Sequence, residues 1–251
     1  MANDVGCRDM ERLDKVISNF GGLTRGEAKE YIKRGRVTVG GETVKDGSRK
    51  VNESDIIRID GNELNCSKYR YFMLNKPEGY ISSTEDDPSD GTPNVIRLFE
   101  KEGVKGLFPV GRLDKDVTGL LIVTNDGALG HDLTAPSKHV DKTYIAEVSK
   151  ILNNDDIKAF ENGFEFKDFK SAPAELEILK TNELSGTSEA KVRIHEGKFH
   201  QVKRMFIKVG CEVMKLKRIS MGKLVLDDKL EPGKYRELSG DELSLIKDNG
   251  F

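Results

Sequence analysis

The chain has 251 residues, 36% hydrophobic and 33% charged, so it can form one medium-sized domain or two small ones. It contains no apolar run near the roughly 18 residues of a transmembrane helix and no secretory signal pattern at its start, so we expect a cytoplasmic protein without membrane contact. The net charge of −2 argues against a polycation that coats nucleic acid. The spacing of Cys7, Cys66, Cys211 and the four histidines indicates free thiols and no metal site.

Residues 10–61 are predicted to form a small unit of their own. Apolar residues recur with a helical period over Met10–Phe20, and Thr24–Glu27 is a capping-box pattern that opens a second helix to about Arg34. A strand at 36–39 then turns into a hairpin at a Gly-Gly pair, and a run rich in isoleucine before residue 60 supplies a last strand. A short polar linker follows, so we place the domain boundary between residues 66 and 67.

The second domain, residues 67–251, is predicted to be α+β with a largely antiparallel mixed sheet and flanking helices. A buried strand at 71–74 ends at Lys76–Gly79, where the proline and glycine reverse the chain. Residues 85–92 are expected to form a mobile acidic surface loop. The remaining strands are expected at 142–149, 174–179, 188–195 and 212–218, and the helices near 155–162, 199–209 and 240–248.

The segment 111–119 lies between two apolar stretches and is therefore predicted to be a loop that joins two buried strands. Arg112 and Asp114 stand two residues apart in it and can be aimed at one point. An aspartate next to glycine is commonly a turn residue, so a structural role for Asp114 stays open. Asp116 is a competing acid in the same loop.

Two later segments complete a candidate site. Tyr144 lies on one face of a predicted strand with Ala146 and Val148, which is also compatible with a place in the core. The helix predicted at 199–209 has one apolar face, and its other side is expected to present a stripe suited to phosphate. That stripe consists of His200, Arg204 and Lys208. The segment 198–218 holds seven basic residues and one acidic residue, which indicates a polyanion footprint.

Three segments resemble, in this order, the catalytic motifs of RNA pseudouridine synthases: 111–120, 142–146 and, as the third motif, 196–206. Residues 12–41 resemble the S4 RNA-binding domain. The resemblance implies that Asp114 is the essential aspartate and that Arg112 fills the gap left by a flipped nucleotide. It implies that Tyr144 stacks on the target uracil and that Lys203, where related families more often have arginine, pairs with Asp114. In the S4-like helix and turn, the residues implied to contact RNA phosphates are Arg25, Lys29, Lys33, Arg34 and Arg36. The chemistry needs no cofactor.

The resemblance covers nearly the whole chain and is closest to ribosomal RNA pseudouridine synthases of the RsuA/RluB/RluF type. The stretches 71–80 and 230–236 look most like the RsuA branch, whose members modify uridine 516 of small-subunit (16S) rRNA. We therefore expect a monomeric isomerase whose partner is 16S rRNA in a partly assembled small subunit. The alternatives are an enzyme of the same chemistry acting on 23S rRNA and a non-catalytic RNA-binding assembly factor.

Overall fold

The computed structural model describes residues 10–247 except positions 53, 65 and 68, so Cys7 and the end of the last predicted helix lie outside it. The chain folds into two compact units. The first comprises residues 10–70 together with Phe99–Gly106, and the second begins at Tyr71 and contains the rest. Sequence patterns did not indicate that Phe99–Gly106 belongs with the first unit. Within the described part of the chain, no helix is long and apolar enough to cross a membrane.

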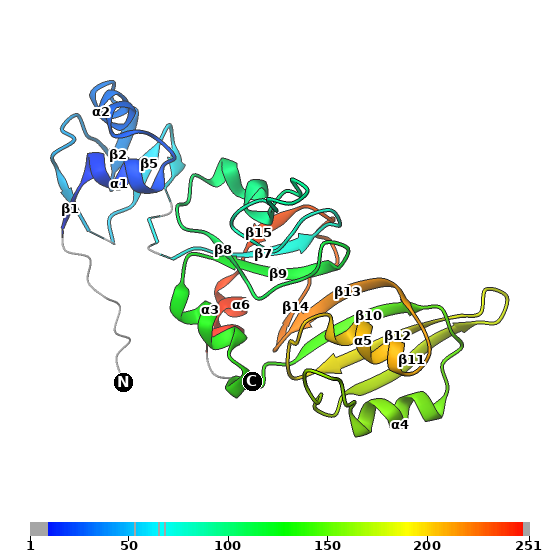
Figure 1. Cartoon of the computed structure of the whole chain (residues 1–251). Helices are drawn as coiled ribbons and strands as arrows, with labels where there is room; N and C mark the ends of the chain where they lie inside the picture. The colour runs from blue at the N-terminus through cyan, green and yellow to red at the C-terminus, as the bar shows by residue number, and fades with distance from the viewer. Residues whose placement is uncertain (1–9, 53, 65, 68, 248–251) are drawn as a thin grey trace, which may run out of the picture. The chain divides into compact units, whose positions relative to one another are not determined.

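The first unit packs two helices on a small sheet (Figure 1). Helix α1 (Leu13–Phe20) starts later than the period predicted, because β1 (Glu11–Arg12) pairs with β4 (Lys50–Val51). Helix α2 (Arg25–Lys33) has the predicted capping box: the Thr24 hydroxyl accepts from the Glu27 amide, and the Glu27 carboxylate accepts from the Thr24 amide.

The sheet of the first unit is antiparallel, in the order β3 (Glu42–Thr43), β2 (Val37–Val39), β5 (Ile57–Ile59), β6 (Asn62–Glu63). Apolar side chains of both helices and of the strands form one core, because each element has a single apolar face. Its buried members are Leu13, Val16, Ile17, Ala28, Ile32, Val37, Val39, Val44, Val51 and Ile57.

The second unit is built on a mixed sheet with nine strands among the described residues. Its main path runs β11 (Glu175–Asn182), β12 (Thr187–Ile194), β10 (Lys142–Val148), β13 (Val213–Met221), β9 (Thr118–Thr124), β7 (Tyr71–Lys76), β15 (Tyr235–Glu237). In addition, β14 (Leu224–Val225) pairs with β13 and β8 (Phe108–Val110) with β9. Among the described strands of this sheet only β9 and β13 pair in parallel, so the α+β prediction with a largely antiparallel mixed sheet is confirmed.

The parallel pairing brings two backbones unusually close at Gly119. This residue has a φ of +101°, and a Cβ there would lie 2.2 Å from the carbonyl oxygen of Arg218. Only glycine permits both the conformation and the approach. Gly119 therefore fixes β9 against β13 directly after the loop that carries Asp114.

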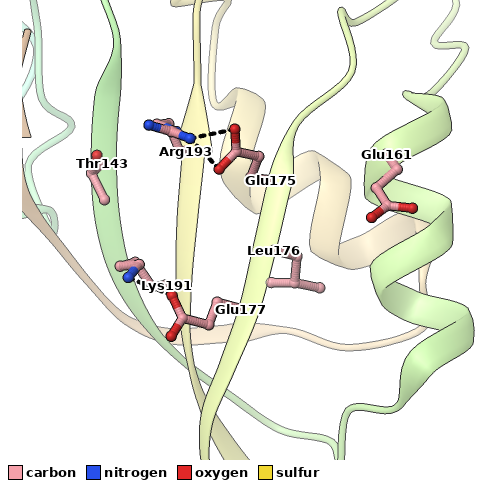
Figure 2. A pocket seen from close by; sticks show the side chains of 7 residues that line it. All are labelled: Thr143, Glu161, Glu175, Leu176, Glu177, Lys191 and Arg193. Atoms are coloured by element: carbon pink, nitrogen blue, oxygen red, sulfur yellow. Dashed lines mark hydrogen bonds and ion pairs between the residues drawn. The ribbon is translucent and has the colours of Figure 1, made fainter.

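The strands β10, β12 and β11 expose a charged face (Figure 2). A cavity of about 520 Å³ lies on it. Its cations are already paired across the strands, Arg193 with Glu175 and Lys191 with Glu177. Thr143 also lines this cavity, and since successive strand residues point to opposite faces, Tyr144 lies on the other side of the sheet. The cavity therefore belongs to a salt-bridged solvent face.

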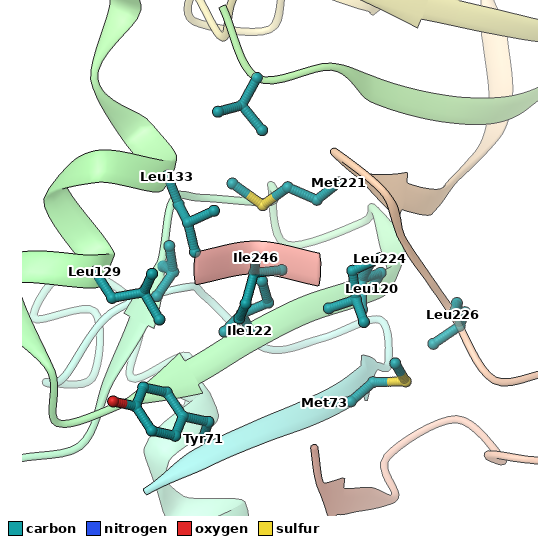
Figure 3. Packing of buried hydrophobic residues seen from close by; sticks show 12 residues of the cluster. Tyr71, Met73, Leu120, Ile122, Leu129, Leu133, Met221, Leu224, Leu226 and Ile246 are labelled. Atoms are coloured by element: carbon teal, nitrogen blue, oxygen red, sulfur yellow. The ribbon is translucent and has the colours of Figure 1, made fainter. Parts of the chain in front are cut away.

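One apolar cluster packs helices α3 (Gly127–Thr134) and α6 (Gly240–Lys247) on the central strands (Figure 3). Its members are Tyr71, Met73, Val110, Leu120, Ile122, Leu129, Leu133, Val140, Met221, Leu224, Leu226 and Ile246. Helices α4 (Asn154–Asn162) and α5 (Gln201–Lys208) meet through Phe160 and Phe206, whose ring centroids are 5.0 Å apart. Two 3₁₀ helices are also described: η1 (Val95–Glu102) lies between β7 and β8 in the chain, and η2 (Pro136–Lys138) lies between α3 and β10.

The acidic stretch 85–92 is tied down at several points. The carboxylate of Asp86 accepts hydrogen bonds from the backbone and side-chain amides of Asn94, at 3.0 and 2.7 Å. Asp90 pairs with Lys115 at 2.9 Å. The predicted mobile loop is therefore held by side-chain hydrogen bonds and fastened to the segment that carries Asp114.

Candidate active site

Residues 111–117 form the connection of the hairpin between β8 and β9, as the sequence predicts. The amide of Val117 donates to the carbonyl of Asp114 at 3.1 Å and closes a turn. Ser82 holds the middle of the loop: its hydroxyl accepts from the Leu113 amide at 3.0 Å and donates to the Leu113 carbonyl at 2.9 Å. The backbone that carries Asp114 is therefore fixed both by its strands and by a neighbouring segment.

Lys76, the last residue of β7, lies fully buried beneath the same loop. Its ammonium group donates to the carbonyls of Val117 at 2.8 Å and of Asp114 and Pro77 at 3.0 Å. Burial lowers the pKa of Lys76 to about 8, and the carboxylates of Asp116 and Asp114 oppose this shift only in part. Sequence analysis missed this role and gave Lys76 only a place in a turn. The available signal was a lysine ending a strand that is otherwise almost wholly apolar.

The carboxylate of Asp114 meets two basic side chains from the third motif, Lys203 and His200. Its Oδ2 lies 3.1 Å from Nζ of Lys203, and its Oδ1 lies 3.4 Å from Nε2 of His200. Lys203 also binds both carboxylate oxygens of Asp116, at 2.7 and 2.9 Å. The expected Asp114–Lys203 contact is present, and the structure adds that Lys203 serves two carboxylates.

Lys203 and Asp116 stabilise each other in their charged forms. Burial disfavours the charge of Lys203, but hydrogen bonds to Asp116 and Asp114 outweigh it and raise the pKa of Lys203. Burial likewise works against ionised Asp116, yet the hydrogen bond from Lys203 prevails and the pKa of Asp116 is lowered. An ammonium group that stays charged at neutral pH is therefore held against Asp114.

Tyr144 is buried in the middle of the sheet, with Val192 opposite it on β12 and Arg218 on β13. It borders a cavity of about 70 Å³ that Asp114 also lines. The full lining is Arg112, Leu113, Asp114, Val117, Tyr144, Ile194, Gly197, Lys198, His200, Gln201, Val202, Lys203 and Leu216. The structure thus brings together all four residues singled out for catalysis and substrate binding.

The predicted phosphate stripe on the third motif does not form as one helical face. Helix α5 begins at Gln201, and His200 precedes it in a left-handed conformation with φ +50°. Arg204 pairs with Asp168 at 2.9 Å and lies over the rings of Phe166 and Phe169. Lys208 lies over Phe166 as well. His200 therefore lies apart from the other two basic residues: it contacts Asp114, whereas Arg204 and Lys208 lie over the ring of Phe166.

The five basic residues singled out in the first unit are all exposed. Arg25 lies 3.7 Å from buried Asp14, and Arg36 pairs with Asp60 and covers the ring of Tyr31 at 3.9 Å. Arg34 lies 3.5 Å from Glu30. Lys29 and Lys33 therefore offer the least committed charges on α2. Among the described residues, no group of three or more His, Cys, Asp or Glu side chains could hold a metal ion.

This geometry defines a small site with one positioned carboxylate, a buried aromatic wall and a fixed cation. Comparison with known proteins identifies the class. The RNA pseudouridylate synthase family model matches residues 70–208, and the S4 domain model matches residues 11–57. The chain belongs to the RNA pseudouridylate synthase family and is therefore an isomerase that carries an S4 domain.

Within this family the chain is of the RsuA/RluB type. It is 40% identical to ribosomal small subunit pseudouridine synthase A of Vibrio parahaemolyticus, over 94% of this chain and 99% of the relative. It is 39% identical to ribosomal large subunit pseudouridine synthase B of Bacillus subtilis, over 95% and 96%. A crystal structure of a pseudouridylate synthase superposes with a TM-score of 0.64 at 36% identity, covering 94% of this chain and 99% of that one. These matches leave no support for a non-catalytic assembly factor.

Proposed function

We propose that this enzyme converts a uridine of small-subunit (16S) ribosomal RNA, at position 516, to pseudouridine, with Asp114 as the catalytic carboxylate. The observation that carries the assignment of Asp114 is its place in one cavity with Tyr144 and next to Lys203. The relatives named small subunit synthase A, together with the RsuA-like stretches around Lys76 and Tyr235, support the small-subunit target.

The reaction breaks the bond between the sugar C1′ and uracil N1 and joins C1′ to C5, while C5 loses a proton and N1 gains one. Electrons balance within the nucleotide, so no oxidant or cofactor is consumed. The uridine must leave the helical stack to reach the site. In our proposal the ring of Tyr144 supports the detached uracil, Arg112 occupies the gap in the RNA, and Lys203 pairs with Asp114 and fixes its rotamer.

Asp114→Asn keeps the size of the side chain and removes its charge. We expect RNA binding to survive while pseudouridine formation falls by at least about 10³-fold, because no second carboxylate of the cavity can replace it. Asp116→Asn is the matched control, since it removes the other carboxylate on Lys203. Tritium release from RNA that contains [5-³H]uridine measures turnover. If Asp116→Asn is inactive and Asp114→Asn retains near-parental turnover, the catalytic role belongs to Asp116.

The target is tested by offering purified enzyme small- and large-subunit rRNA, each naked and within partly assembled particles, and mapping the pseudouridines. We expect modification of 16S rRNA in a 5′-domain ribonucleoprotein and poor modification of short hairpins, because RNA is read largely by shape around the flipped base. The second candidate target is 23S rRNA, which the 39% identity to a large-subunit synthase favours. Modification confined to 23S rRNA would replace the first proposal by the second.

The first unit is proposed to add affinity by contacting RNA phosphates through Arg25, Lys29, Lys33, Arg34 and Arg36. In the second unit, His200, Arg204 and Lys208 are proposed to bind RNA, Arg204 and Lys208 through phosphates and His200 next to Asp114. We also propose that the chain acts as a monomer in the cytoplasm. The bacterial relatives are named for ribosomal subunits, which supports the cytoplasmic location.

A further inference from the structure

An exposed aromatic pair stands at the rim of the Asp114 cavity. Phe199 leaves 74% of its surface exposed, and its ring stacks on that of His200, with centroids 3.7 Å apart and planes 19° apart. The mechanism proposed above has no use for Phe199. A large apolar ring beside a catalytic cavity is a candidate contact for a ligand.

The backbone holds this pair in an unusual conformation. His200 has φ +50° and ψ +31°, a left-handed geometry that only a few per cent of non-glycine residues adopt. This turn directs Nε2 of His200 to within 3.4 Å of Asp114 while its ring face stays against Phe199.

A buried glutamine locks the segment that carries the pair. Gln201 is 3% exposed, its Oε1 accepts from the Lys198 amide at 3.0 Å, and its backbone amide donates to the Lys198 carbonyl at 3.1 Å. Its Nε2 donates to Glu196 at 2.8 Å, and that carboxylate also accepts the Ala172 amide at 2.9 Å. The aromatic pair is therefore preorganised in the free protein.

We infer that the Phe199–His200 pair is a stacking platform for the unpaired base next to the target uridine in the RNA chain. This inference rests on the proposed catalytic role of Asp114. A nucleotide next to the flipped uridine remains covalently linked to it, so its base can reach the rim of the cavity where the Phe199–His200 pair lies. Proteins hold unstacked RNA bases on the faces of Phe, Tyr, Trp and His side chains, and such stacking is tolerant of base identity. The nearby charge of Lys198 favours the flanking phosphates.

The test measures kcat/KM for tritium release from [5-³H]uridine, using whichever rRNA the parent enzyme modifies. Phe199→Ala should lower kcat/KM by about 5- to 150-fold, the range for loss of one stacked base. Phe199→Tyr should keep parental activity, because it retains the ring. Ile207→Ala is the matched control, since Ile207 is 62% exposed on the adjacent α5 and should be neutral. Thermal unfolding of each variant checks that the fold is unchanged.

A second arm identifies the occupant. Two RNAs are made, one abasic at the position before the target and one abasic at the position after it. With the parent enzyme, one of these two RNAs should lower kcat/KM by the same factor as Phe199→Ala does. Combining that RNA with Phe199→Ala should cause no further loss, since both changes remove the same contact. Unchanged kcat/KM for Phe199→Ala, or additive losses at both positions, would overturn the platform. An inactive Asp114→Asn together with an unaffected Phe199→Ala would refute the platform alone, whereas an active Asp114→Asn would refute the catalytic assignment.

Discussion

Lys203 pairs with two carboxylates at once, and its nitrogen lies closer to Asp116 than to Asp114. The side chain is only 20% exposed, so loss of its charge would leave two acids facing each other in a partly sequestered site. Asp116 thus helps to hold Lys203 in place for Asp114. A lysine gives one compact charge instead of the planar fork of arginine, so it is able to bridge both loop acids from one point.

Lys203→Met is expected to reduce turnover by roughly 10- to 100-fold, because a hydrogen bond to a charged group contributes about 1.5–3 kcal/mol. RNA affinity should change little, and Lys203→Arg should be the mildest substitution. The measurement is kcat/KM alongside the Kd for RNA. Lys208→Met is the control, since it should weaken binding more than turnover. Equal losses of binding in the two methionine variants would make Lys203 another phosphate contact.

Lys76 should give the stability of the protein a specific pH dependence. Its folded-state pKa is about 8, against 10.5 for an unperturbed lysine, so between these values the unfolded chain binds more protons. The contribution of Lys76 to the free energy of unfolding should therefore increase from about pH 8 to 10.5. Below pH 8 the full cost of burying the charge is present.

The check is urea denaturation of the parent and of Lys76→Met between pH 7 and 10. Other groups titrate in the same window, Lys142 with the same sign and Cys211 with the opposite sign, so the difference between the two proteins isolates Lys76. We expect the parent to gain stability relative to the variant as pH rises. The variant should also lose turnover, because the carbonyls of Asp114 and Val117 lose their donor. A pH-independent difference would show that Lys76 titrates as it does in water.

Between elements, the decisive contact is that of β9 with β13. It turns an antiparallel sheet into a mixed one and sets the end of the loop that carries Asp114 against the strand that follows α5. Arg218 lies in this contact, 2% exposed, and its Nε donates to the Leu120 carbonyl at 2.8 Å. The site is therefore assembled by strand pairing more than by contacts among its own side chains.

Gly119→Ala should lower the free energy of unfolding by more than about 3 kcal/mol, because a left-handed alanine costs about 1–2 kcal/mol and the new methyl group also collides with the Arg218 backbone. Gly186→Ala is the control: Gly186 has φ +67° with nothing within 4 Å, so only the backbone cost of about 1–2 kcal/mol applies. Urea denaturation compares the two variants. Equal losses would mean that the close approach at Gly119 relaxes without cost.

For the whole molecule, the S4 domain should supply affinity while the chemistry stays in the second unit. Lys29→Ala combined with Lys33→Ala should lower the slope of log K against log salt by roughly 0.7–0.9 for each lost phosphate contact. The rate of turnover at saturating RNA should remain near the parental value. Lys158→Ala on α4 provides the control, since its side chain is 70% exposed but outside both basic segments. RNA binding measured from low to high salt checks this, and an unchanged slope for the double variant would exclude α2 from the RNA contact.

The sequence by itself determined most of what is local. The capping box at Thr24, the hairpin loop around Asp114 and the strand that carries Tyr144 follow from turn chemistry and hydrophobic period, and the structure has each of them. The sequence motifs also determined the family, because Arg112, Asp114, Tyr144 and Lys203 stand in separate segments in a fixed order. Helix ends were predicted less well. The sequence predicted a helix over 199–209, but α5 begins after His200 because that residue adopts a left-handed conformation, which the hydrophobic period does not indicate.

Only the tertiary structure decided which side chains share a partner. Lys76 and Ser82 reach the Asp114 loop from other segments of the chain, and Lys203 binds Asp116 as well as Asp114. The parallel pairing at Gly119 and the contact of Arg204 with Asp168 also became known only from the tertiary structure. The physical reason is that hydrophobic period and turn propensity describe a residue and its near neighbours in the chain, whereas burial and ion pairing depend on segments brought together by folding.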